Sequence, residues 1–222
     1  MLIPYRDNDA IPIFPRITVL LIFANLNAFT FELWQRSHGH LGDLILTWGL
    51  TPQRVTQAFG PQVMLTFVTA LFLHGDWLHF LGNMLYLWVF GNNIEASLGD
   101  VGYLLFYLVC GGAALGLHIL FAPGSPLPVI GASGAIAGLL GAYLVAYPRA
   151  RIRVFFFLIV FRTFNVPALL LLGMWFVLQL LNGAASLGEY AASGGVAYFA
   201  HIGGFAAGAL LMALFNLLPE DQ

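Results

Sequence analysis

The sequence predicts an all-α polytopic membrane protein, a bundle of six transmembrane helices that occupies residues 1–222 as a single domain. Two observations support this prediction. Hydrophobic residues make up 60% of the chain and charged residues only 8%, whereas a soluble domain carries about 25% charged residues. Six apolar runs also approach the length of about 20 residues that a helix needs to cross the hydrocarbon core. This composition argues against a soluble enzyme, a nucleic-acid-binding protein and a disordered chain.

The expected spans account for about half of the chain. The residues before the first span, which include Arg6, Asp7 and Asp9, lack the charged, apolar and cleavage regions of a removable signal, so we expect that span to be a permanent helix. The six spans are expected at residues 16–34, 78–95, 101–121, 132–147, 166–182 and 200–218.

Three connecting stretches do not fit simple spans. Residues 35–77 are too long for an ordinary loop, and their apolar piece, residues 63–73, is too short to cross, so it is expected at the interface or partly submerged. Residues 154–161 are apolar but are flanked by arginines, so they are expected along the inner interface. Residues 183–199 contain many glycines and serines and are expected to form a flexible outer loop that could cover a site.

The arginines indicate the orientation, since inner loops of membrane proteins are enriched in positive charge. With the N-terminus inside, only Arg36 and Arg54 lie on the outer side. Six arginines against two favour an N-in/C-in topology, and an even number of spans agrees with it. The inner arginines would be Arg6, Arg16, Arg149, Arg151, Arg153 and Arg162.

A few strongly polar side chains lie inside the expected spans, where they are costly and indicate function. His79 and Asn83 open the second span and share one helix face because they are four residues apart. Ser133 opens the fourth span and His201 opens the sixth. In the N-in topology, spans two, four and six all run from outside to inside, so these groups share one shallow depth below the outer boundary.

Glycines predict that spans four and six touch. Gly134 and Gly138 form one pair at i, i+4 spacing, and Gly204 and Gly208 form another, which allows close backbone approach. Packing alone is the alternative explanation for such pairs. Close contact of the two spans would bring Ser133 beside His201.

That arrangement permits nucleophilic chemistry. A serine hydroxyl attacks a carbonyl when a neutral imidazole takes its proton. No carboxylate lies in spans four and six, so Ser133 and His201 would form a dyad rather than a triad. The backbone N–H of Ser133 at a helix start, together with the side chains of His79 and Asn83, could stabilise the oxyanion.

These motifs resemble those of the rhomboid family of intramembrane serine proteases, over roughly residues 60–215. The matching segments are Gly131-Ala132-Ser133-Gly134, His201 with Gly204 and Gly208, His74 with His79 and Asn83, and the turn from Gly91 to Gly99. The resemblance implies Ser133 as nucleophile, His201 as base, His79 and Asn83 as oxyanion-stabilising groups, and Gly131, Gly134, Gly138, Gly204 and Gly208 as packing residues at the site. It also implies six core helices, a water-filled cavity that opens outward, and no metal or cofactor.

The resemblance predicts a protease that cleaves transmembrane segments of membrane proteins near the outer face of a lipid bilayer, with no nucleic-acid partner. A bacterial plasma membrane is expected from the small size and the Arg-only cationic composition. Two alternatives stay open: an inactive relative that binds membrane helices, and a small-molecule transporter, although transporter sites lie nearer the midplane.

Two positions depart from the family pattern. Met64-Leu65 stand where many members have Trp-Arg, and Ala137 stands where some members have an aromatic ring that stacks on the histidine.

Other residues have simpler interpretations. Asp76 is expected to cap the helix that follows it, and His74 to be a structural loop residue. Cys110 is expected to pack in an apolar run. Glu32 is expected near an outer span end with access to water. Trp175 and Phe176 mark the fifth span as a candidate lateral gate, by position alone.

Overall fold

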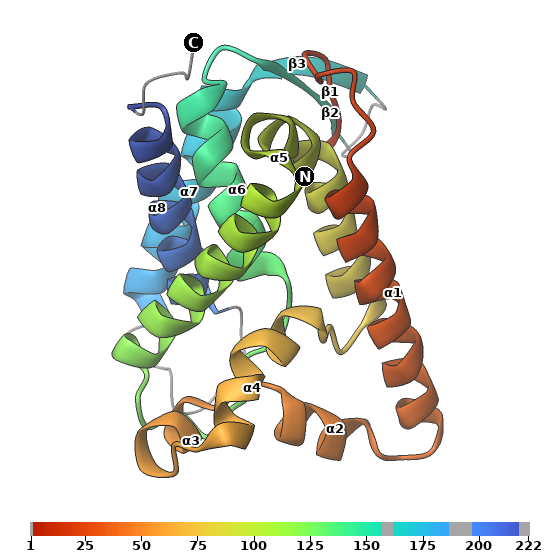
Figure 1. The fold of residues 1–222 in the computed structure, drawn as a ribbon, viewed down its shortest axis with the longest axis vertical. Helices are drawn as coiled ribbons and strands as arrows, with labels where there is room; N and C mark the ends of the chain where they lie inside the picture. Colours follow the sequence, from red (N-terminus) through yellow and green to blue (C-terminus); the bar gives the residue numbers. More distant parts are fainter. Residues whose placement is uncertain (1, 157–161, 187–196, 218–222) are drawn as a thin grey trace.

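The computed structural model describes residues 2–156, 162–186 and 197–217, and most of them are helical (Figure 1). The predicted spans overlap helices α1 (Arg16–Ser37), α5 (Trp77–Phe121), α6 (Ser133–Ala146), α7 (Ala168–Ser186) and α8 (Tyr198–Phe215). Two of the predicted spans lie within α5, which is interrupted at Gly99. The backbone there has φ 68° and ψ 169°, a conformation that glycine adopts without steric cost.

The helices have the surface of a membrane protein. Within the described part of the chain, α1, α5, α7 and α8 are long and apolar enough to cross a bilayer, whereas α6 is shorter, with 14 residues. Large apolar side chains project outward from these helices, among them Phe23 at 61% exposure and Leu210 at 61%. Water would not tolerate so much exposed apolar surface, so the chain is a polytopic helical membrane protein.

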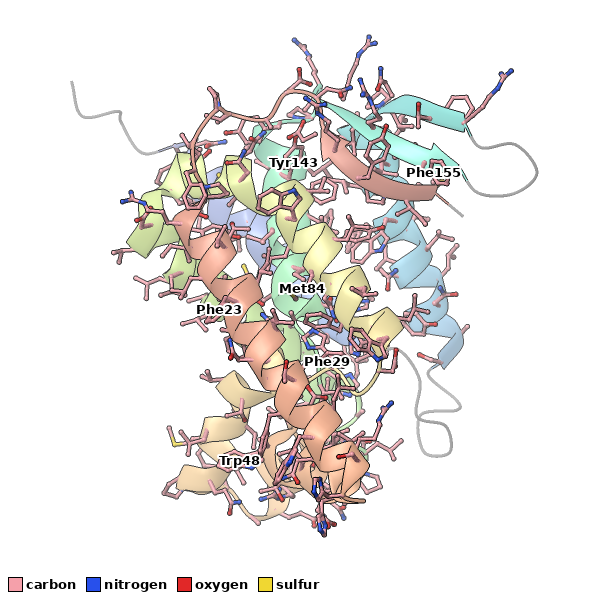
Figure 2. The ribbon with its side chains drawn as sticks, turned by 90° about the vertical axis from the view of Figure 1, so that its right-hand side faces the viewer. Phe23, Phe29, Trp48, Met84, Tyr143 and Phe155 are labelled. Atoms are coloured by element: carbon pink, nitrogen blue, oxygen red, sulfur yellow. The ribbon has the colours of Figure 1, made fainter. Side chains whose placement is uncertain are left out.

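A small sheet caps one end of the bundle, which corrects the all-α prediction (Figures 1 and 2). Strands β1 (Leu2–Asp7), β2 (Arg151–Phe156) and β3 (Arg162–Pro167) pair antiparallel in the order β1-β2-β3. Ile152 and Val154 alternate with arginines in β2, and both are buried under the sheet. Part of the predicted interfacial stretch 154–161 is therefore a strand; residues 157–161 lie outside the described residues.

The long connection after α1 lies at the opposite end of the bundle and consists of short helices (Figure 1). They are α2 (Leu41–Trp48), α3 (Pro52–Gln57), α4 (Pro61–Thr69) and the 3-10 turn η1 (Ala70–Phe72). The apolar piece predicted not to cross the membrane forms α4 and η1. Leu50, after α2, forms an antiparallel bridge with Val129, which ties this layer to the segment before α6.

Helix α7 continues to Ser186, so the start of the predicted outer loop is helical instead. The reason is contact with α8: a Cβ atom at Gly183 would lie 3.2 Å from Ile202 Cδ1 and 3.5 Å from Tyr198 Cβ. Because Gly183 has no side chain, α7 stays packed against α8 for another turn. At the other end of the predicted loop, Tyr198 and Phe199 belong to α8, and residues 187–196 lie outside the described residues.

The predicted contact between spans four and six is confirmed as a contact between α6 and α8. A Cβ atom at Gly204 would overlap the carbonyl oxygen of Gly134, and one at Gly208 would overlap that of Gly138. Only glycine permits this backbone approach. The expectation for Cys110 is also confirmed, since its buried side chain packs where a Cβ at Gly138 would be.

Candidate active site

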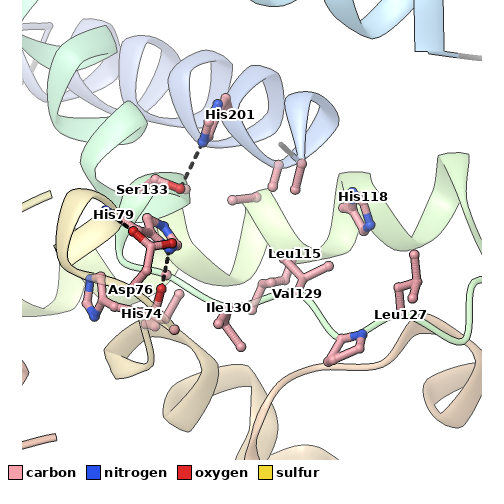
Figure 3. A pocket seen from close by; sticks show the side chains of 18 of the residues that line it. His74, Asp76, His79, Leu115, His118, Leu127, Val129, Ile130, Ser133 and His201 are labelled. Atoms are coloured by element: carbon pink, nitrogen blue, oxygen red, sulfur yellow. Dashed lines mark hydrogen bonds between the residues drawn. The ribbon is translucent and has the colours of Figure 1, made fainter. Parts of the chain in front are cut away.

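The closely packed α6 and α8 bring the predicted serine and histidine together. Ser133 is the first residue of α6, and His201 lies in the first turn of α8. The Oγ atom of Ser133 lies 2.8 Å from Nε2 of His201, within hydrogen-bonding distance, and both side chains are half-buried (Figure 3). The glycine contacts hold the two helix starts in this position.

The other ring nitrogen of His201 has a partner that the sequence analysis missed. Oε1 of Gln179, on α7, lies 2.9 Å from Nδ1 of His201. An amide oxygen only accepts, so Nδ1 carries the proton and Nε2 is left to accept from the Ser133 hydroxyl. The ring of Trp175, also on α7, lies 5.7 Å from the His201 ring between centroids. An aromatic neighbour therefore comes from α7 although Ala137 provides none.

A second pair of polar side chains converges just before Ser133. Gly131 has φ +117°, and a Cβ atom there would lie 2.5 Å from Nε2 of His79 and 3.7 Å from Nδ2 of Asn83. Gly131 thus packs against His79. Nδ2 of Asn83 is buried and has no hydrogen-bond partner within the described chain. Nδ1 of His79 donates to the His74 carbonyl over 2.7 Å. In the neutral ring Nε2 therefore carries no hydrogen, and it can donate only in the imidazolium form.

His79, Ser133 and His201 border a cavity of about 850 Å³ (Figure 3). Its wall is polar near the serine and apolar on the side of the segment that precedes α6. Among the described residues, no group of three His, Cys, Asp or Glu side chains is arranged to hold a metal ion. Residues on the cavity wall include His74, His79, Leu115, His118, Leu127, Val129, Ser133 and His201.

The segment that leads into α5 is held by a buried carboxylate. Both oxygens of Glu32 accept from the backbone N–H of His74, at 3.0 and 3.1 Å, and one also accepts from Gly75 at 2.7 Å. Glu32 is 1% exposed, so the expected access to water was wrong. Asp76 caps α5 as predicted, accepting from the His79 N–H at 2.9 Å. These contacts fix the start of the helix that carries His79.

His74 packs beneath this segment and is 1% exposed. Burial, together with the nearby His79, lowers the pKa of its imidazole to about 4. Its Nδ1 donates to the Phe72 carbonyl over 3.1 Å, and its ring centroid lies 5.1 Å from that of His79. His74 is therefore a neutral residue that supports the position of His79.

The fold and the site together define a class of protein. It is a polytopic membrane protein in which a serine and a histidine meet at the starts of two helices in contact. The family model of the Rhomboid domain matches residues 61–217, well over half of the chain. The chain belongs to the rhomboid family.

Three curated relatives illustrate the range of similarity. The mitochondrial Rhomboid protein 1 of Saccharomyces cerevisiae is 28% identical over 162 residues, which cover 71% of this chain and 44% of that protein. The chloroplastic Rhomboid-like protein 11 of Arabidopsis thaliana is 41% identical over 73 residues, 33% of this chain and 26% of that protein. Rhomboid protease GluP of Bacillus subtilis is 40% identical over 77 residues, 35% of this chain and 15% of that protein. The matches thus span less than half the length of these relatives.

Proposed function

We propose that this protein is an intramembrane serine endopeptidase that cleaves transmembrane segments of other membrane proteins. The observation that carries the proposal is the 2.8 Å contact between Ser133 Oγ and His201 Nε2 at the edge of a cavity of about 850 Å³. Family membership supports the same activity, since one relative is named a rhomboid protease.

In the proposed reaction, Ser133 attacks the carbonyl carbon of the scissile peptide bond while His201 Nε2 takes the hydroxyl proton. The tetrahedral intermediate collapses when the imidazolium returns this proton to the leaving amine, which leaves an acyl ester on Ser133. A water molecule then attacks the ester as His201 takes its proton, and the carboxylic acid product departs as the proton returns to the Ser133 oxygen. The cavity volume is large enough to admit that water.

The oxyanion in each step would be stabilised by donors at the start of α6. The backbone N–H of Ser133 lies at a helix N-terminus, where such groups lack helical partners. The unpartnered Nδ2 of Asn83 supplies a buried side-chain donor. His79 adds a donor and a positive charge when both of its ring nitrogens are protonated, because Nδ1 is already engaged by the His74 carbonyl.

We further propose six spans with both termini inside, formed by α1, the two halves of α5, α6, α7 and α8, as one domain. The inner arginines then include those on β1, β2 and β3. Substrates would be single-pass or polytopic membrane proteins cut near the outer face. The compartment stays a prediction: the names of relatives mention the chloroplast and mitochondria, and these do not support the expected bacterial plasma membrane.

The test is cleavage of a model single-pass substrate in proteoliposomes. The wild type should cut it near the outer face, whereas Ser133→Ala and His201→Ala should not. Ser125→Ala is the matched control, since Ser125 also lines the cavity but has no assigned role, and it should cleave like the wild type. A folded wild-type protein that binds the substrate without cutting it would refute the proposal and favour an inactive, helix-binding relative.

A further inference from the structure

Gln179 is a buried amide on α7, a helix that is mostly apolar. Its side chain is 9% exposed, and its Oε1 atom meets Nδ1 of His201 at 2.9 Å. Trp175 and Gly183 lie four residues to either side, on the same face of α7. Trp175 contacts the rings of His201 and Phe205, and Gly183 packs against α8 as well. Gln179 is therefore the polar centre of the stripe that α7 presents to α8.

This contact decides which form of His201 faces the serine. A neutral imidazole carries its proton on one nitrogen, and only a ring protonated on Nδ1 has Nε2 free to accept from Ser133. Without an acceptor at Nδ1, the other tautomer and other ring orientations become accessible. In those states Nε2 cannot accept the proton of the Ser133 hydroxyl. Among the described residues, Ser133, Gln179 and Trp175 contact the ring of His201. The charged or titratable side chains on the wall of the same cavity are those of Arg36, His74, Asp76, His79 and His118.

Gln179 lies on α7, a helix that contacts the rest of the protein over only part of its surface. Much of the α7 surface faces away from the protein, including Leu170 at 63% exposure and Leu181 at 62%. Its face toward α8 relies on the stripe, together with Phe176 stacked on Phe205 at 4.3 Å. The hydrogen bond to His201 can exist only while this face of α7 stays against α8.

We propose that Gln179 is a positioning residue that fixes the tautomer and orientation of His201, and that it thereby makes the Ser133–His201 pair competent only when α7 is packed against α8. This inference rests on the proposed protease function. Movement of α7 away from α8 would break the hydrogen bond that orients His201. While the two helices are apart, Ser133 would therefore not attack a peptide bond.

The first experiment compares two amide-to-leucine changes on the same helix in reconstituted protein. Gln179→Leu removes the acceptor at similar volume and should lower kcat about 10-fold, the effect of losing one net hydrogen bond, with KM within about twofold. Asn182→Leu is the matched control, since Asn182 is exposed on α7, and it should behave like the wild type. Equal kcat values for Gln179→Leu and the wild type would overturn the proposal.

A conservative replacement separates positioning from packing. Gln179→Glu keeps an acceptor oxygen at Nδ1 and should retain most of kcat. Its carboxylate favours the imidazolium, so the acid limb of kcat/KM should move to higher pH by about one unit. A Glu variant as inactive as Gln179→Leu, or one with an unmoved acid limb, would contradict the assigned contact.

A double-mutant cycle tests the link to α7. Gly183→Val places branched carbons where Ile202 is already 3.2 Å from a single added Cβ, so it should push α7 away from α8 and lower kcat. In that background, Gln179→Leu should cost less than about twofold, because the hydrogen bond is already broken. Full additivity would refute the coupling. An inactive wild type would instead refute the proposed function itself.

Discussion

The approach of α6 to its neighbours allows a sharp prediction at Gly134, the residue after Ser133. A Cβ atom added there would lie 2.6 Å from Cβ of Ala114 on α5. Carbon atoms in contact prefer about 3.5 Å or more, so Gly134→Ala must separate the two helices by roughly 1 Å. The backbone next to Ser133 moves with that separation.

The cost follows from the geometry of the pair. A displacement of roughly 1 Å along the 2.8 Å contact between Ser133 Oγ and His201 Nε2 would break the hydrogen bond. Misplacement of this size can cost about 100-fold in rate, and overpacking of a core typically costs about 1–3 kcal/mol of stability. We expect Gly134→Ala to lower kcat/KM about 100-fold while the protein stays folded.

Cleavage of a model transmembrane substrate in proteoliposomes, with denaturant unfolding beside it, measures both effects. Gly116→Ala is the control on α5, since an added Cβ there meets nothing within 4 Å. Adding Ala114→Gly removes the atom that the new methyl group strikes, so the double variant should regain most of the activity. Wild-type activity in Gly134→Ala, or no rescue in the double variant, would refute the claim that glycine packing sets the position of Ser133.

Three further predictions concern the groups around the pair. Asn83→Ala should lower kcat by about 100-fold or more with little change in KM, as expected for a lost oxyanion donor in steady-state kinetics. Glu32→Gln should reduce the free energy of unfolding by about 1–3 kcal/mol, measured by denaturant titration, because the amide keeps one acceptor oxygen and places its NH2 group against the N–H donor of His74. An unchanged stability would contradict its structural role. The pKa of His74 is about 4 in the folded protein, against an ordinary value of about 6.5. Between pH 6.5 and pH 4, roughly, His74 is therefore protonated in the unfolded chain and neutral in the folded one. Thermal stability of the wild type should therefore fall with acidification through this window more steeply than that of His74→Gln, and parallel melting curves would count against the buried neutral histidine.

The helices and the serine–histidine pair could be predicted because each depends on local pattern. Long apolar runs fix where α1, α5, α7 and α8 lie, and glycines at i, i+4 spacing indicate which helices can touch. The polar residues at the helix starts then stand out against an apolar background. Asp76 was also predictable, since its partner is the N–H of His79 only three residues away.

The sheet and the buried carboxylate were not predictable in this way. The partners of β1 lie about 150 residues further along the chain, and an apolar alternating strand next to arginines has the same composition as an interfacial segment. Glu32 binds backbone groups 42 residues away, which no local pattern indicates. Gln179 differs, because an amide within a predicted span is a functional signal by the same rule that selected His79.

The proposed function depends on activation of the Ser133 hydroxyl by His201. The most direct measurement is reaction of the membrane-reconstituted protein with a fluorophosphonate probe, followed by mapping of the adduct by peptide mass spectrometry. We expect one adduct, on Ser133, that is absent in His201→Ala and present in Ser125→Ala. An adduct on another residue, or equal labelling of Ser133 in wild type and His201→Ala, would contradict it.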